Sequence, residues 1–250
     1  MKSLVVVAVL VGLAIPEVAF ANQGILLLVQ NGTSDWNAQV NALAAKVNAL
    51  KPVEVAFGTP TRSTVAPAVD RLAKRGATEV VAVPFFLSAA VSPEDLTGHA
   101  IPVRIAPAAA GDPLFSEIIL SRAQEISQQP TGEVLVLIGY DSDDAGRPWV
   151  IDLVPSARRL NQTRRFASIL TIAKPVGQTE AERQSLRLSL ERLGRGRPIV
   201  VVPMMNSGSG TDPAIEQTLR GFTYRTAKGG VISDDRVVEW LANQTATSVR

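Results

Sequence analysis

The side chains of this 250-residue sequence that are best suited to bind a ligand stand in polar turns directly after short apolar runs. Residues 25–29 form one such run, which is too short for a helix and has the length of a strand buried on both faces. In an open α/β sheet, the loop after a strand's carboxyl end borders the crevice where ligands bind. The amide and hydroxyl groups of Gln30, Asn31 and Thr33 therefore form the first candidate ligand-binding group.

Other polar side chains occupy the same kind of position later in the chain. They are Ser88, Ser92, Tyr140, Ser207 and Ser209. The last two belong to a glycine-rich stretch, whose backbone N–H groups suit a phosphate or carboxylate at a helix N-terminus. The same composition also suits a flexible turn between a strand and a helix, because the stretch lacks the lysine of a P-loop.

Metal binding would rely on oxygen ligands or on a single imidazole, because the chain has no cysteine and one histidine. Asp141, Asp143 and Asp144 share one loop, and their carboxylates suit Mg²⁺ or Ca²⁺ better than cobalt or ferrous iron. The same aspartates are equally suited to capping the helix that follows them. His99 lies between an acidic segment and an expected strand at 101–105, where it is either a metal ligand or a structural residue.

Two kinds of element alternate along the sequence and would position these loops. Apolar residues at helical spacing, such as Trp36, Val40 and Leu43, follow the first run and predict an amphipathic helix. Further strands are expected at 53–57, 79–83, 101–105, 133–138, 166–172 and 198–202, and further helices from about 92–95 and over 114–126 and 182–193. Such alternation predicts an α/β fold with parallel sheets covered by helices.

The second half of the sequence repeats the order of the first. Residues 128–132 have the composition of a linker, and the apolar run 133–138 that follows them is similar to the run at 25–29. Each half also ends on acids five residues apart, which are Asp112 with Glu117 and Asp234 with Glu239. We interpret the pattern as duplication of one α/β unit, with a ligand cleft where the two copies meet. The expected lobes are residues 22–127 and, more degenerate, residues 133–250.

The first residues have the composition of an export signal. Lys2 is followed by an apolar run at 4–15 and by small residues at 19–21, which is the pattern of a signal peptide cleaved after Ala21. An uncleaved anchor and a first core strand are the alternatives. Removal of residues 1–21 predicts a periplasmic or secreted protein that keeps no stable membrane anchor.

Composition argues against a nucleic-acid partner. The formal net charge is +2 and the aromatic content 5%, and no basic stripe with interleaved aromatic residues is present. The arginines concentrate near helix ends and loops, where solvated charges are common. We therefore expect a small-molecule ligand as the partner, and the oligomeric state stays open.

The turns at 30–35 and 84–92 resemble those of the class II tetrapyrrole metal chelatases, in particular the long, duplicated sirohydrochlorin cobaltochelatases and ferrochelatases. In that family the first strand leads into Gly-His-Gly-Ser-Arg, and the third leads into Pro-Leu-Phe-Leu-Ser-Ala-Gly with a histidine two residues further on. Here the frame is kept, but Asn31 and Ser92 stand at the two histidine positions. The resemblance covers about residues 24–126 well and 133–245 more faintly, and it implies two chelatase-like, flavodoxin-like lobes of three layers.

The exchanged histidines limit the activity that the resemblance implies. A neutral imidazole can hold a divalent metal and accept pyrrole protons, whereas an amide or a hydroxyl cannot serve as the base. We therefore expect an exported chelatase-like protein that binds a tetrapyrrole, a metal chelate or another small anionic ligand in the interlobe cleft without efficient chelation. An active chelatase with non-histidine ligands and a structural or partner-binding module are the alternatives. Cobalt or iron is the divalent metal that the resemblance implies.

Overall fold

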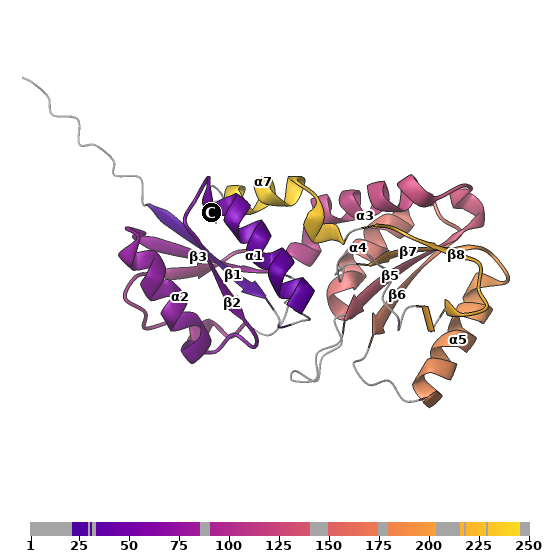
Figure 1. The fold of residues 1–250 in the computed structure, drawn as a ribbon, viewed down its shortest axis with the longest axis horizontal. Coiled ribbons are helices and arrows are strands. Elements are labelled where there is room, and N and C mark those ends of the chain that lie inside the picture. Colours follow the sequence, from indigo (N-terminus) through magenta and orange to yellow (C-terminus); the bar gives the residue numbers. More distant parts are fainter. Residues whose placement is uncertain are drawn as a thin grey trace, which may run out of the picture.

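Two four-stranded parallel sheets organise the chain in the computed structural model (Figure 1). The structure describes residues 22–29, 31, 34–85, 91–140, 150–174, 180–203, 216, 217, 219–228 and 230–245. The first sheet has the order β2-β1-β3-β4 and the second the order β6-β5-β7-β8. The strands are β1 (Gln23–Val29), β2 (Val53–Phe57), β3 (Glu79–Pro84), β4 (Val103–Ile105), β5 (Val134–Tyr140), β6 (Ser168–Lys174), β7 (Ile199–Pro203) and β8 (Tyr224–Thr226).

Helices connect the strands and cover the sheets. They are α1 (Ser34–Asn48), α2 (Arg62–Lys74), α3 (Pro113–Ile126), α4 (Val150–Gln162), α5 (Glu180–Gly194) and α7 (Arg236–Asn243). Short 3₁₀ turns are η1 (Pro93–Leu96), η2 (Ala109–Gly111), η3 (Pro130–Gly132) and η4 (Val231–Ser233). Among the helices of the described residues, none combines the length and the apolar character that a bilayer crossing requires.

The layers follow from the alternation of side chains along the buried strands. In β1, Leu26 and Leu28 face α2, whereas Ile25, Leu27 and Val29 face a core that continues into the second sheet. That core contains residues of α1, α3, α4 and α7 together with the inner faces of β5 and β7. Helix α5 covers the outer face of the second sheet. In the described part of the chain, α1, α3, α4 and α7 therefore lie between the two sheets, whereas α2 and α5 cover the outer faces, and the helical residue Leu219 also packs on the outer face of the second sheet (Figure 1).

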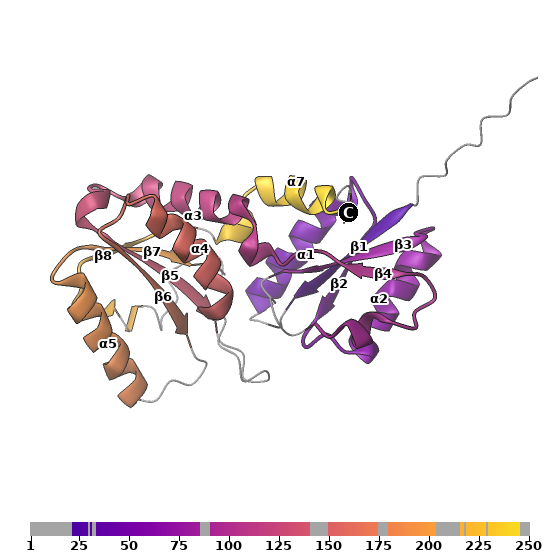
Figure 2. The same ribbon diagram turned by 180° about the vertical axis from the view of Figure 1, so that it is seen from behind.

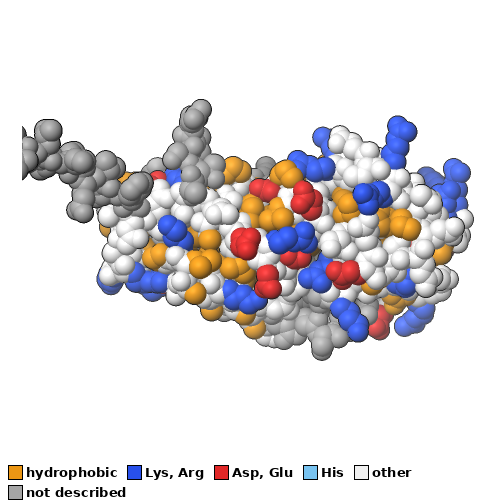
Figure 3. Space-filling model, turned by 90° about the horizontal axis from the view of Figure 1, so that it is seen from above, with side chains coloured by type: hydrophobic (Ala, Val, Ile, Leu, Met, Phe, Trp, Pro, Cys, Tyr) orange, Lys and Arg blue, Asp and Glu red, His pale blue; other side chains and the backbone are white. Residues whose placement is uncertain are grey.

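The helices that close the two halves are exchanged between the sheets. Helix α3 follows the first sheet in sequence but packs on α4 and β7 of the second. Helix α7 follows the second sheet but packs on α1 of the first, as both ribbon views show (Figures 1 and 2). Acidic side chains gather over the middle of the molecule, where α3 and α7 meet, when it is seen from above (Figure 3).

Matching aspartates begin the two exchanged helices. Asp112 accepts a hydrogen bond from the backbone N–H of Leu114 at 2.9 Å, and its second oxygen accepts one from the indole N–H of Trp240 at 2.8 Å. The Trp240 ring meets the ring of Phe115 edge to face, with 5.0 Å between centroids. Asp234 accepts in the same way from the N–H of Arg236 at 3.1 Å.

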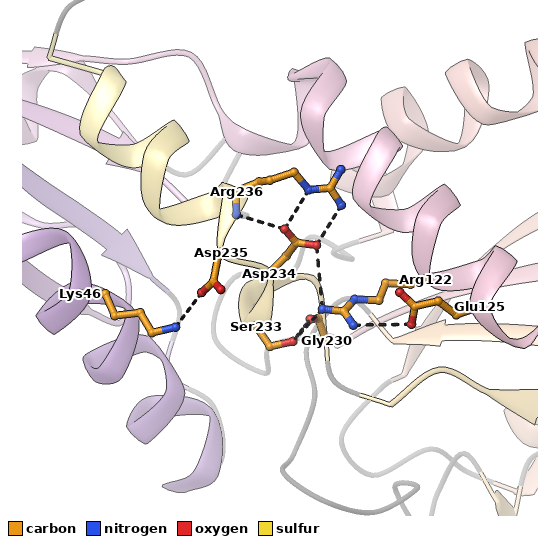
Figure 4. Close-up of polar contacts among 8 residues, drawn as sticks. All are labelled: Lys46, Arg122, Glu125, Gly230, Ser233, Asp234, Asp235 and Arg236. Carbon is orange, nitrogen blue, oxygen red and sulfur yellow. Dashed lines mark hydrogen bonds and ion pairs between the residues drawn. The ribbon is translucent and has the colours of Figure 1, made fainter.

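Asp234 also joins α7 to α3 through charge. Two hydrogen bonds of 2.9 Å from the guanidinium of Arg236 hold its carboxylate, and Arg122 of α3 lies 3.9 Å away (Figure 4). The hydrogen bonds from Arg236 lower the pKa of Asp234 further than burial raises it. The neighbouring Asp235 pairs with Lys46 of α1 at 2.8 Å, so α7 has charged contacts with both sides of the junction.

The predicted α/β class with parallel sheets in two lobes is confirmed. A helix does start at 92–95 as expected, but it is the single 3₁₀ turn η1, which ends at Leu96 before Gly98 in a left-handed conformation with φ of 71°. The strand expected at 101–105 is shorter, since β4 pairs with β3 only over Val103–Ile105.

Candidate functional site

The carboxyl ends of the strands in both sheets point toward the junction between the lobes (Figures 1 and 2). Because β1, β2 and β3 pair in parallel, the turns that follow them lie at the same end of the first sheet, which is the carboxyl end of the strands. Asn31 follows β1, so the topology places it on the side of the first sheet where α/β proteins bind ligands.

Asn31 stands just beyond β1 and is exposed. Its amide nitrogen lies 3.4 Å from the place where a side chain on Gly58 would begin, and Gly58 has a φ of 93°. The N–H of Gly58 donates to the carbonyl of Val29 at 2.8 Å, which fixes the turn after β2 beside the end of β1. A glycine at this turn therefore leaves room for the Asn31 amide next to the carboxyl ends of both strands.

Ser92 has a structural role at the helix start that the sequence indicates. It is the N-cap of η1, and its hydroxyl accepts a hydrogen bond from the N–H of Glu94 at 3.3 Å. Its carbonyl accepts from the N–H of Asp95 at 3.1 Å. Serine is among the residues best suited to a cap, whereas histidine is not. The second histidine position of the resembled family is thus occupied here by a residue that starts a helical turn.

His99 is tied to its own segment. Its Nε2 lies 3.2 Å from the carbonyl oxygen of Asp95, and the side chain is half-buried. It borders an open hollow of about 370 Å³ whose described lining consists of residues 96–103. The guanidinium of Arg62, at the start of α2, donates to the carbonyl of Gly98 at 3.0 Å and holds this segment against the first lobe. These contacts favour the structural interpretation of His99 and do not bring it to Asn31 or Ser92.

Several predicted site residues lie outside the described residues. They are Gln30, Thr33, Ser88, Asp141, Asp143, Asp144, Ser207 and Ser209. Tyr140 ends β5, but its side chain also lies outside the part that the structure describes. Within the described part of the chain, no group of three or more histidine, aspartate or glutamate residues is arranged to hold a metal ion. The predicted metal role of the three aspartates stays a prediction.

A second hollow lies beside the outer edge of β2, and its lining extends along the strand from Val53 to Phe57. It measures about 400 Å³ and its lining includes Asn48, Glu54, Arg71 and Arg75. Both guanidinium groups are paired with the carboxylate of Glu54, at 2.7 Å and 3.2 Å, and Arg75 also donates to the carbonyl of Val53 at 3.0 Å. Because the two guanidinium groups share the one carboxylate of Glu54, a single net positive charge remains for an anionic ligand in this hollow.

Sequence reasoning missed one buried charge at the opposite, amino end of the second sheet. Glu133 is 2% exposed and pairs with Arg225 of β8. It also accepts hydrogen bonds from the hydroxyl of Ser127 and from the N–H groups of Gln128 and Gln129, at 3.1 and 3.2 Å for the latter two. Burial raises the pKa of Glu133, but these hydrogen bonds and Arg225 together bring it below its usual value. The sign of this buried charge in the sequence is a single glutamate directly before the apolar residues 134–138.

Comparison with known proteins agrees with the geometry. Residues 25–126 match the CbiX family model. DR2241 from Deinococcus radiodurans, a multi-domain protein with structural similarity to chelatases, superposes with a TM-score of 0.63 and 16% identity over 92% of this chain. This chain covers 56% of DR2241 and so spans little more than half its length. SirB from Bacillus subtilis, solved with Fe³⁺, superposes with a TM-score of 0.61 and 16% identity, over 90% of this chain and 94% of SirB.

No curated protein has a sequence that matches this chain significantly. The agreement of fold extends over both lobes, whereas the match to the family model covers the first. Residues 25–126 are thus similar to the CbiX family, and the chain as a whole shares its two-lobed α/β fold with the chelatase-like DR2241 and with SirB.

Proposed function

We propose that the protein is an exported chelatase-like binding protein that holds a tetrapyrrole, a metal chelate or another small anionic ligand between its lobes without efficient metal insertion. The similarity of residues 25–126 to the CbiX family and the direction of the strand ends support the place of binding. The observation that carries the second half of the proposal is the cap at Ser92, because it gives a structural use to a position where the resembled family has a catalytic histidine.

Metal insertion needs a base as well as a metal ligand. The divalent ion is a substrate of the reaction, and two pyrrole protons must leave the ring as it enters. The amide of Asn31 has no basicity, the hydroxyl of Ser92 faces an N–H donor, and the ring of His99 faces the carbonyl of Asp95. A ring already carrying its metal makes no such demand. SirB was solved with Fe³⁺, which supports iron, beside cobalt, as the metal of a bound chelate.

Export is supported by the order of Lys2, the apolar run at 4–15 and the small residues at 19–21. N-terminal sequencing of the protein recovered from cell fractions tests it. A first residue of Asn22 in the periplasmic or secreted fraction is the expected result, and an intact Met1 on protein from the cytoplasm would contradict it.

Titration with sirohydrochlorin, followed by absorbance, tests ligand binding and insertion together. We expect a saturable spectral change on mixing protein and ring, and insertion of Co(II) or Fe(II) no faster than in buffer alone. Asn31→Leu should weaken ring binding, whereas Asn161→Leu, at the exposed end of α4, should leave it unchanged. Insertion above the rate in buffer would show that the protein has a base elsewhere, and no spectral change would refute tetrapyrrole binding.

A further inference from the structure

Six exposed arginines gather at the amino end of the second sheet. They lie on three connections, with Arg164 and Arg165 before β6, Arg192, Arg195 and Arg197 before β7, and Arg220 before β8. We call them the amino-edge arginine cluster. None of the six forms a salt bridge with another residue that the structure describes. Basic side chains stand out along this end of the molecule (Figure 3).

The first sheet lacks such a cluster. Its corresponding connections, residues 49–52, 75–78 and 99–102, contain Lys51 and Arg75, and Lys74 stands in the last turn of α2 as Arg192 does in the last turn of α5. Arg75 is paired with Glu54, so two cations, Lys51 and Lys74, remain there without a salt bridge to a described residue. Because both sheets have the same strand order, the fold itself does not require arginine at these turns.

Backbone conformation gives a second, independent observation. Arg164 and Arg195 have φ values of 51° and 47°, in the left-handed region that disfavours residues with a side chain. The turn after α2 places Gly76 in this region instead, with φ of 88°. Glycine would satisfy the two turns of the second sheet better than arginine, so folding does not explain the choice.

Acidic groups at this edge do not neutralise the cluster. Glu133, which precedes β5, is buried and already matched by Arg225. Glu191 is the exposed acid on the last turns of α5, beside three of the arginines. Arg187 lies over the ring of Phe222 at 5.1 Å and donates to the carbonyl of Arg220, which covers the aromatic ring nearest to the cluster.

The shape of the cluster indicates the kind of partner. Strands β6 and β8 are three positions apart in the sheet, so the arginines span about 14 Å, which is wider than one phosphate group. Neither hollow described above lies among them, and the Phe222 ring that could stack on a base is covered. Guanidinium groups bind phosphate oxygens in pairs. An extended surface with many phosphates satisfies these conditions better than a single small anion or an unstacked nucleic acid.

We propose that the amino-edge arginine cluster docks the protein on anionic phospholipid membranes. The cluster is at the end of the second sheet opposite its carboxyl-terminal loops, so a docked protein keeps the candidate ligand site open to solvent. Each arginine near an anionic leaflet strengthens binding about five-fold, so a set of six supports measurable, salt-sensitive association.

Vesicle sedimentation tests the proposal with protein purified from cells in its naturally processed form. We expect binding to vesicles that contain phosphatidylglycerol, little binding to pure phosphatidylcholine, and release as ionic strength rises. Arg164→Gly with Arg195→Gly should weaken binding about twenty-five-fold, from about five-fold per arginine. The melting temperature should not fall, because glycine suits both turns. That result would separate binding from folding.

The matched control removes the same charge from the first lobe. Lys51→Gln with Lys74→Gln replaces two exposed lysines and should leave vesicle binding nearly unchanged. Equal binding to neutral and anionic vesicles, or an unaffected arginine variant, would overturn the proposal. So would tighter binding to duplex DNA or polyglutamate than to the vesicles at the same ionic strength, since the cluster would then serve a different polyanion.

Discussion

At the scale of single residues, the candidate site differs from that of the resembled chelatases at positions 31 and 92, where that family has histidine. Asn31 is exposed beside the glycine turn after β2, whereas the hydroxyl of Ser92 caps η1. The two positions therefore differ in how readily an imidazole can be restored. A histidine at residue 31 has open space, and a histidine at residue 92 displaces a cap worth about 1 kcal/mol.

Restoring both imidazoles should create affinity for cobalt. We expect Asn31→His with Ser92→His to bind Co(II) more tightly than the wild type by orders of magnitude, because imidazole nitrogen suits this ion far better than amide or hydroxyl oxygen. Calorimetry with Co(II) measures it, with each single variant as the control. If the double variant bound no better than Asn31→His, the two turns would not meet around one ion.

The buried acid at the other end of the second lobe should make stability depend on pH. Because its folded pKa is lowered, Glu133 stabilises the fold above its unfolded pKa of about 4.5, and this contribution is lost as pH falls through the folded value. Glu133→Gln should cost about 2–3 kcal/mol near neutral pH, since Arg225 loses its charged partner. Urea unfolding at pH 7 and at pH 4 measures both effects.

The pH dependence shows whether Glu133 stabilises the fold through its charge. Asp234 also has a lowered pKa and remains in the variant, so some loss of stability on acidification should persist. The difference in free energy of unfolding between wild type and Glu133→Gln should become smaller as pH falls. A difference that is the same at both pH values would mean that Glu133 stabilises the fold through packing and neutral hydrogen bonds alone.

At the scale of elements, the sequence predicted the strands well and the helix exchange not at all. Runs such as 25–29 and 134–138 are apolar at every position, so burial on both faces can be inferred without knowing the neighbours. The apolar face of α3, by contrast, shows only that some sheet must cover it. Its apolar side chains would satisfy that requirement on either sheet, so the packing of α3 on α4 and β7 required coordinates.

The candidate site was predictable to a similar, limited degree. The positions of Asn31 and Ser92 after β1 and β3 follow from the strand pattern alone. In the cap formed by Ser92, the hydroxyl accepts a hydrogen bond from the N–H of Glu94, and Pro93 is the first residue of the turn. The resemblance to the chelatase turn does not predict this local geometry. The matched spacing of Asp112 and Asp234, in turn, was visible in the sequence before its role at the helix starts was known.

The hydrogen bond from the Trp240 indole to Asp112 joins the exchanged helices, and its contribution to the free energy of unfolding can be measured. Asp112→Ala removes both the cap of α3 and the acceptor of the Trp240 indole, so we expect a loss of about 2–4 kcal/mol. Trp240→Phe keeps the ring contact with Phe115 but lacks the N–H donor. A double-mutant cycle, read by urea unfolding with circular dichroism, should therefore give a coupling of about 1 kcal/mol or more.

Asp235→Ala is the matched control for this cycle. Asp235 reaches across the same junction to Lys46, but its side chain is 88% exposed and that of Lys46 is 60% exposed. Exposed ion pairs contribute little, so we expect a change below about 0.5 kcal/mol. Coupling near zero between Asp112 and Trp240 would show that the junction is held by its apolar core and not by this hydrogen bond.

At the scale of the whole molecule, the exchange makes the lobes depend on one another. One apolar core runs from the inner face of the first sheet through α1, α3, α4 and α7 to the inner face of the second. Opening the junction would expose that core, so large hinge motion between the sheets is costly. The candidate ligand site is therefore expected to be largely preformed, with adaptation confined to its loops.

The same architecture predicts that neither half folds alone. A fragment of residues 22–132 would leave α3 without the second sheet, and a fragment of residues 133–250 would leave α7 without α1. Each fragment should lack cooperative unfolding by circular dichroism, whereas co-expression of both should give a one-to-one complex on size-exclusion chromatography. Trp240→Ala in the second fragment should weaken that complex, because the indole fills the junction beside Phe115. A stable, cooperatively unfolding monomer from either fragment would mean that the exchanged helices decorate two independent domains and that the shared core does not bind them into one folding unit.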